Sequence, residues 1–203
     1  MAKIKICGLT RIMDIEAVNK TLPDYIGFVF ARSKRQINEN KAKVLKAYLN
    51  PSIKTVGVFV NEEIENIIKL CKSGVIDIIQ LHGDEDEDYV NELKKHISNN
   101  IIKAIRVKSK QDIRDALEFP CDYLLLDTYH EKKYGGIGKT FDWSYITDLN
   151  KPYFLAGGIN STNVIRAIRH HKPYCIDVSS GVEVNGYKDP AKIMEMVAMV
   201  RQV

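Results

Sequence analysis

The sequence predicts a compact barrel of eight parallel β-strands that alternate with helices. Eight short apolar runs of β type recur along the 203-residue chain, separated by segments whose apolar residues have helical spacing. Several runs consist almost entirely of Val, Ile, Leu and Phe, which is typical of parallel strands buried on both faces. Eight strand–helix repeats are the number that closes such a barrel. We therefore expect a (βα)8 fold.

The eight runs follow one another along the whole chain. They are "IKICG" (4–8), "YIGFVF" (25–30), "TVGVFV" (55–60), "IDIIQLHG" (76–83), "IIKAIRV" (101–107), "YLLLDT" (123–128), "YFLAGG" (153–158) and "CIDVSSG" (175–181). Helical segments such as "NEEIENIIKLCKSG" and "STNVIRAIRHHK" lie between them, and we expect Asn61 and Ser161 to cap two of these helices. Since no composition break or long linker interrupts the alternation, residues 1–203 are expected to form a single domain.

An open, doubly wound sheet is the alternative architecture, because it has the same alternation of strands and helices. A dinucleotide-binding sheet of that kind would carry G-x-G-x-x-G at the turn after its first strand. The first run here is followed by "LTR", which contains no glycine. This difference, together with the count of eight, favours the barrel.

Composition and charge exclude several classes of protein. The chain is 45% hydrophobic and 28% charged, the composition of an ordinary globular protein. Its longest apolar runs are far below the roughly 20 residues of a membrane span, and the first residues lack the features of a signal peptide. We therefore expect a cytoplasmic protein with no membrane partner.

The net charge of +4 arises from basic residues interleaved with acidic ones. A nucleic-acid-binding protein would show a basic stripe with interspersed aromatic residues, and none is present. A mild positive bias instead suits a small, multiply charged anion. The expected partner is a small phosphorylated molecule.

The cysteines and the acidic run give no sign of a metal or disulfide. Cys7, Cys71, Cys121 and Cys175 are widely spaced, with no C-x-x-C pair and no nearby histidine grouping. The acidic run "DEDED" at 84–88 is better explained as the N-terminus of a helix, where acidic side chains favour the helix dipole. We expect reduced thiols, no metal and no cofactor.

Polar groups stand at the carboxyl ends of several runs. In a barrel these ends meet at one mouth, where active sites lie. Any one such residue is commonly explained by local hydrogen bonding, and a free cysteine is usually a small buried hydrophobe. Polar residues at the ends of several runs are harder to explain by local hydrogen bonding alone. In chain order the run ends carry Cys7, Phe30, Asn61, His82, Arg106, Asp127, Gly157 with Gly158, and Asp177.

The clearest separate signal is for phosphate. "AGGIN" ends the seventh run with Gly157 and Gly158, and "VSSGVE" after the eighth supplies Ser180 and Gly181. Many barrels hold a phosphate in the loops after strands 7 and 8, where glycine allows the backbone N–H groups to approach the anion closely. Although such glycines also serve as simple turns into helices, their presence in both loops predicts a phosphate site.

These motifs carry a family resemblance. The segments "KICGLT", "GFVF" followed by "SKRQI", "VGVFVN", "QLHGDE", "LLLDT", "YGGIGKTFDW", "LAGGIN" and "DVSSGVE" closely resemble the phosphoribosylanthranilate isomerase family of tryptophan biosynthesis. The match runs in order from Lys5 to about Asp189. One departure is Lys34, which stands where many relatives have proline.

The resemblance implies a (βα)8 fold and an Amadori rearrangement of N-(5-phosphoribosyl)anthranilate to 1-(2-carboxyphenylamino)-1-deoxyribulose 5-phosphate. It implies that Asp127 is the acid that opens the sugar ring and that Cys7 is the base that removes the C2′ proton. It further implies that Arg35 binds the anthranilate carboxylate, that Asp177 accepts hydrogen bonds from sugar hydroxyls, and that His82 contacts the substrate. Nearby Lys or Arg side chains are expected to favour the thiolate form of Cys7.

The loop "YHEKKYGGIGKTFDW" (129–143) is expected to cover the mouth and exclude water from a Schiff base.

Two other functions stay open. Indole-glycerol-phosphate synthase would share the barrel and an anthranilate-bearing phosphate substrate, but that family uses lysines and glutamates at its strand ends. A catalytically inactive phosphate-binding barrel would keep the glycine loops and lose the acid and base. The protein is expected to be a monomer or a homodimer.

Overall fold

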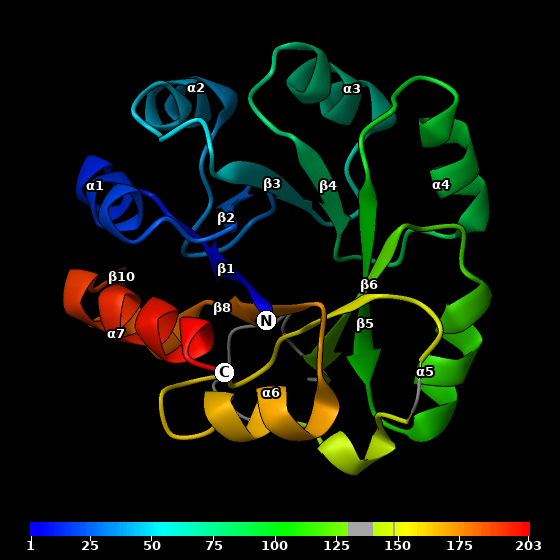
Figure 1. The fold of residues 1–203 in the computed structure, drawn as a ribbon. Helices are drawn as coiled ribbons and strands as arrows, with labels where there is room; N and C mark the ends of the chain where they lie inside the picture. The colour runs from blue at the N-terminus through cyan, green and yellow to red at the C-terminus, as the bar shows by residue number, and fades with distance from the viewer. Residues whose placement is uncertain (130–139, 148) are drawn as a thin grey trace.

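The computed structural model describes residues 1–129, 140–147 and 149–203, and within them eight parallel strands close into a barrel (Figure 1). Each strand pairs with its neighbours in sequence, and β8 pairs with β1 to close the barrel. The strands are β1 (Lys3–Cys7), β2 (Tyr25–Val29), β3 (Lys54–Phe59), β4 (Ile78–Leu81), β5 (Ile101–Val107), β6 (Tyr123–Thr128), β7 (Tyr153–Leu155) and β8 (Cys175–Val178). The predicted barrel and all eight predicted strands are confirmed.

Helices surround the barrel (Figure 1). The α-helices of the described ranges are α1 (Ile12–Thr21), α2 (Glu39–Ala47), α3 (Ile64–Lys72), α4 (Glu87–Lys94), α5 (Lys110–Asp115), α6 (Val164–His171) and α7 (Pro190–Arg201). Short 3-10 turns are η1 (Ala116–Glu118), η2 (Trp143–Tyr145) and η3 (Ser180–Val182), and a small hairpin pairs β9 (Glu183–Val184) with β10 (Tyr187–Lys188). Helix α7 packs against α1 and β1, so the last helix meets the first strand–helix unit. Of the helices in the described ranges, none is long and apolar enough to cross a membrane.

The two predicted helix caps are wrong. Helix α3 begins at Ile64 with Glu63 at its N-cap, whereas Asn61 has a positive φ of 49° and accepts a hydrogen bond from the Asp84 N–H at 2.7 Å. Helix α6 begins after Asn163, and Ser161 lies in the preceding turn. In both cases the residue lies in the loop before the helix, because the helix begins later in the sequence than the pattern suggested.

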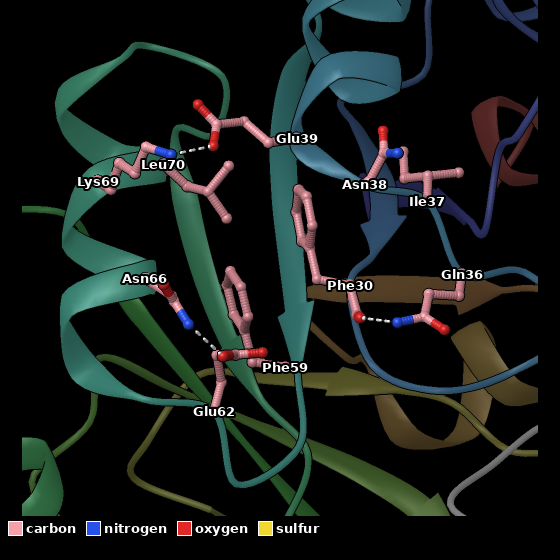
Figure 2. A pocket seen from close by; sticks show the side chains of 10 residues that line it. All are labelled: Phe30, Gln36, Ile37, Asn38, Glu39, Phe59, Glu62, Asn66, Lys69 and Leu70. Carbon is pink, nitrogen blue, oxygen red and sulfur yellow. Dashed lines mark hydrogen bonds and ion pairs between the residues drawn. The ribbon is translucent and has the colours of Figure 1, made fainter.

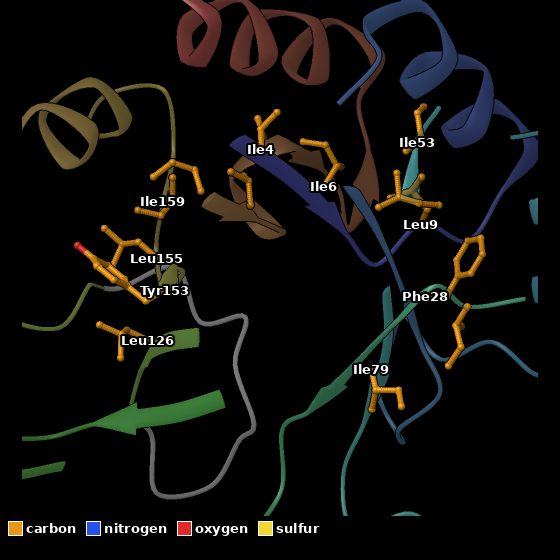
Figure 3. Packing of buried hydrophobic residues seen from close by; sticks show 14 of the residues in the cluster. Ile4, Ile6, Leu9, Phe28, Ile53, Ile79, Leu126, Tyr153, Leu155 and Ile159 are labelled. Atoms are coloured by element: carbon orange, nitrogen blue, oxygen red, sulfur yellow. The ribbon is translucent and has the colours of Figure 1, made fainter. Parts of the chain in front are cut away.

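Side chains alternate between the outside and the inside of the barrel. Outward residues such as Ile4, Ile6, Leu126 and Leu155 pack between the strands and the helices (Figure 3). A second cluster fills the barrel interior, and most of its members lie in the first halves of their strands. It contains Tyr25, Val56, Ile78, Ile102, Ala104, Leu125, Phe154, Ala156 and Cys175. Towards the carboxyl ends this filling is replaced by buried polar groups, and these groups form the site.

Candidate active site

Cys7 is the last residue of β1 and is only 9% exposed. It lies directly across from Gly27 of β2, where a Cβ atom would come within 2.6 Å of the Cys7 sulfur. Any side chain at position 27 would therefore displace the thiol. The sequence places glycine there because Sγ points into the barrel interior at that level.

Burial raises the pKa of the Cys7 thiol above its ordinary value of 9.0, and Asp177 raises it further. The ammonium groups of Lys5 and Lys188 act in the opposite direction without reversing the shift. The expected positive neighbours are present, but they only reduce the cost of forming the thiolate. The expectation that they would favour it outright is corrected, because desolvation is the larger effect.

Asp127 lies near the end of β6 and is buried. Its Oδ1 accepts a hydrogen bond from the Thr128 N–H at 2.8 Å, and its Oδ2 lies 3.2 Å from His82 Nε2. Gly157 approaches from the next loop with φ of 77°, and a Cβ there would lie 2.3 Å from Thr128 Oγ1 and 3.0 Å from Asp127 Oδ1. Glycine is thus required for the loop after β7 to close over the carboxylate.

A fully buried lysine lies beneath the mouth. Lys5 is two residues before Cys7, on the same face of β1, and its Nζ donates to Gln80 Oε1 at 2.7 Å and to Asp177 Oδ2 at 2.9 Å. Burial opposes the charge on Lys5, but the Asp177 carboxylate and the Cys7 sulfur together outweigh it, and the pKa of Lys5 is raised. The other oxygen of Asp177, Oδ1, is buried and has no hydrogen-bond partner among the described residues.

Arg35 reaches the mouth across the backbone of Gly8, where a Cβ would lie 2.4 Å from the arginine Cδ. Its guanidinium forms a two-point ion pair with Glu183, with Nε to Oε1 at 2.6 Å and Nη2 to Oε2 at 2.8 Å. Buried Lys188 also donates to Glu183 Oε1 at 2.6 Å and to the Ser179 carbonyl at 2.9 Å. Burial opposes the charge on Glu183, but these two cations keep its pKa below the ordinary value.

The two predicted phosphate loops are packed against each other. Gly157 and Gly158 have φ of 77° and 67°, in the left-handed region that glycine adopts readily. A Cβ on Gly181, within η3, would lie 2.0 Å from the Ile159 carbonyl oxygen, so glycine is required for this contact. The structure therefore brings Gly157, Gly158, Ser180 and Gly181 to neighbouring loops, and anion binding there stays a prediction.

The acidic run lies at the N-terminus of α4, as predicted. The side chain of Asp86 caps the helix by accepting from the Tyr89 N–H at 2.9 Å, while Glu85 pairs with buried Lys103 at 2.8 Å. Within residues 1–129, 140–147 and 149–203, no group of three or more His, Cys, Asp or Glu side chains is placed to hold a metal ion.

A separate cavity of about 460 Å³ lies outside the barrel, between α2 and α3 (Figure 2). The stacked rings of Phe30 and Phe59, 5.2 Å apart, form part of its wall. Its charged rim groups Lys69 and Glu39 pair with each other at 2.6 Å. Of the residues predicted at the mouth only Phe30 lines it, and we assign it no role.

The sequence interpretation missed four groups at the mouth: Lys5, Gln80, Glu183 and Lys188. Two of them had a readable signal, because Lys5 and Gln80 each lie two residues before a predicted site residue and so share its face of the strand. The predicted cover at 129–143 lies mostly outside the described residues, at 130–139.

A closed parallel barrel with a thiol, a carboxylate and an imidazole at the carboxyl ends of its strands defines the protein as a (βα)8 barrel equipped for acid–base chemistry. The sequence model of the family described as N-(5'phosphoribosyl)anthranilate (PRA) isomerase matches residues 4–199. The chain belongs to this family, which confirms the resemblance.

Individual relatives agree. The chain is 49% identical over 203 residues to the N-(5'-phosphoribosyl)anthranilate isomerase of Endomicrobium trichonymphae, with full coverage of both chains. Its structure is similar to that of the phosphoribosyl anthranilate isomerase from Thermotoga maritima, with a TM-score of 0.88, 37% identity and full coverage of both chains. A further similar structure, at 34% identity, a TM-score of 0.87 and full coverage, is an isomerase in complex with reduced 1-(o-carboxyphenylamino)-1-deoxyribulose 5-phosphate.

Proposed function

We propose that the isomerase reaction of this chain, the Amadori rearrangement of N-(5-phosphoribosyl)anthranilate, uses Cys7 as the base and Asp127 as the acid. The observation that carries the proposal is that these two residues, 120 positions apart in the sequence, end β1 and β6 of one barrel whose family catalyses this isomerisation. Both side chains are buried at the mouth, where water competes little for their protons.

The chemistry requires one proton to be given and another to be taken. Asp127 gives a proton to the furanose ring oxygen as the C1′–O bond breaks, which leaves a Schiff base on the anthranilate nitrogen. The Cys7 thiolate then removes the proton from C2′, and the resulting enolamine tautomerises to the ketone. The Thr128 N–H already donates to Asp127 and would stabilise the carboxylate that forms in the first step.

Binding is assigned to the groups around this pair. Arginine has five N–H donors, and Glu183 engages two of them, so Arg35 keeps donors for the anthranilate carboxylate. Asp177 Oδ1, buried without a partner among the described residues, would accept from a sugar hydroxyl. The loops with Gly157, Gly158, Ser180 and Gly181 would hold the phosphate, and His82 would lie beside the reacting part of the substrate.

A turnover assay tests the proposal directly. The purified chain is expected to consume N-(5-phosphoribosyl)anthranilate, followed by loss of its fluorescence, and to form the aminoketose without forming indole-glycerol phosphate. In a second reaction the aminoketose itself is supplied. Indole-glycerol phosphate formed from it would support the synthase alternative, and no turnover of either substrate would support the inactive barrel. Four further expectations stay predictions. They are a single domain over 1–203, a cytoplasmic location, the absence of a cofactor, and a monomeric or homodimeric state.

A further inference from the structure

A continuous line of buried polar groups crosses the barrel interior from β1 to β6. Lys5 Nζ donates to Gln80 Oε1 at 2.7 Å, Gln80 Nε2 lies 2.7 Å from His82 Nδ1, and His82 Nε2 lies 3.2 Å from Asp127 Oδ2. Lys5 and Gln80 are at most 1% exposed. Burying polar groups this deeply costs free energy unless each one is hydrogen-bonded. The partner of each group therefore indicates which of its atoms donates and which accepts.

The chemistry of the first link fixes the orientation of the next. An ammonium group can only donate hydrogen bonds, so the Gln80 side chain must turn its oxygen towards Lys5. The amide nitrogen of Gln80 therefore faces the imidazole of His82. This assignment follows from donor and acceptor matching, which is the usual basis for orienting an amide side chain.

The same logic fixes the tautomer of His82. Because an amide NH2 group can only donate, Nδ1 of His82 must accept, and a neutral imidazole then carries its proton on Nε2. His82 Nε2 lies 3.2 Å from Asp127 Oδ2, but its N–H is off the line of a good hydrogen bond. Contacts of this kind are often poorly aligned before substrate binds and tighten in the reactive complex.

We propose that Gln80, held by Lys5, is a positioning residue that fixes His82 as the Nε2–H tautomer and so presents a hydrogen-bond donor to the acid Asp127. The part that concerns catalysis rests on the proposed function. The donor stabilises the carboxylate that Asp127 becomes once its proton has passed to the substrate. With the opposite tautomer, a lone pair on Nε2 would face that carboxylate and repel it.

Nitrogen-15 NMR of His82 tests the tautomer without reference to activity. The chain has five histidines, and His82→Gln assigns the signal by its loss. The wild-type spectrum is expected to show Nε2 protonated and Nδ1 unprotonated. In Gln80→Glu the new carboxylate accepts where the amide donated, so Nδ1 is expected to carry a proton. In Gln80→Met, which cannot donate and accepts only weakly, both tautomers are expected. Gln202→Glu makes the same exchange at an exposed residue near the C-terminus and should leave the His82 spectrum unchanged.

Steady-state kinetics test the consequence. Gln80→Met is expected to lower kcat by about tenfold or more with a smaller change in KM, because the lost contact is made to the charged form of the acid. A wild-type His82 with its proton on Nδ1, or a spectrum unchanged in Gln80→Glu, would overturn the tautomer assignment. The expected spectra together with wild-type kcat in Gln80→Met would overturn the catalytic part. Full activity of Asp127→Asn would instead mean that the proposed acid is wrong, so the two failures are distinguishable.

Discussion

The interior of the barrel has two ends built from the same strands but filled differently. The carboxyl ends hold ion-paired and hydrogen-bonded groups, namely Lys5, Gln80, Asp127 and Asp177. The amino ends hold a cluster of rings in which Phe154 packs against Tyr25, Tyr123 and Tyr174 with centroids 5.6 to 5.8 Å apart.

Positions two residues apart on one strand can belong to different ends. On β8, Cys175 packs in the apolar cluster and Asp177 pairs with Lys5, although their Cα atoms are only about 6.6 Å apart. Stability is therefore expected to depend mainly on the amino ends and catalysis mainly on the carboxyl ends. Four substitution or labelling experiments can break or sharpen this comparison.

Phe154→Ala tests the amino end and should have the largest effect. Removing a fully buried aromatic side chain leaves a cavity, so the free energy of unfolding should fall by about 3–5 kcal/mol, while kcat of the folded fraction stays near wild type. Urea unfolding and turnover at low temperature measure the two quantities. A strong loss of kcat in fully folded Phe154→Ala would contradict the proposal that the amino ends govern stability and the carboxyl ends govern catalysis.

Arg35→Lys tests the carboxyl end. Lysine keeps the charge but loses the planar fork, so substrate binding should weaken by about 1–3 kcal/mol, measured as a rise in KM or in the Kd of a reduced product analogue. Arg32→Lys, an exposed arginine in the same loop, is the matched control. Equal, near wild-type kinetics for both variants would make Arg35 a surface residue with a structural ion pair to Glu183.

The pH dependence of thiol alkylation tests the electrostatics of Cys7. Only the thiolate reacts, and burial raises the pKa of Cys7 above 9.0, so the labelling rate should still be rising as pH passes that value. Mass spectrometry of labelled peptides separates Cys7 from Cys71, whose pKa burial raises to about 11. A Cys7 labelling rate that levels off near neutral pH would show that Lys5 and Lys188 outweigh burial.

Gly158→Asp tests the phosphate loops and should have the smallest effect on folding. The new carboxylate repels the substrate phosphate, so KM should rise several-fold, and more than in Gly158→Asn, which has the same shape without the charge. Both residues tolerate the positive φ of 67° better than other side chains do. A crystal structure from crystals grown in phosphate should show an anion against the backbone of Gly158 and Gly181. Equal KM values for the two variants would argue against a phosphate site in these loops.

The barrel could be predicted because its signals are local. Each strand is a short apolar run, and eight of them in alternation with helices leave few architectures. Helix starts were harder, since Asn61 looks like a cap but accepts from the Asp84 N–H, and Ser161 looks like a cap but lies in the turn before α6. Which loop residue caps a helix depends on loop length, and local pattern does not reveal it.

Site residues that end a strand could be predicted from the sequence. Site residues whose role depends on contacts with distant side chains could not. Cys7, His82 and Asp127 could be placed at one mouth from the strand order alone. Glu183 could not be matched with Arg35, because 148 positions separate them and only the closed barrel brings them together. The raised pKa of Cys7 was also out of reach, since it reflects the balance of burial against two buried lysines.

The central claim is that Cys7 and Asp127 divide the base and acid steps between them. Cys7→Ser and Asp127→Asn should each lower kcat by at least about a hundredfold while the protein stays folded, because serine is almost never ionised and an amide cannot deliver the proton.

The most direct measurement compares the two variants on an analogue already opened to its Schiff base. Ring opening is then no longer required, so Asp127→Asn should recover much of its lost rate and Cys7→Ser should not. Near-normal turnover by folded Cys7→Ser, or equal recovery by both variants on the opened analogue, would contradict the assignment.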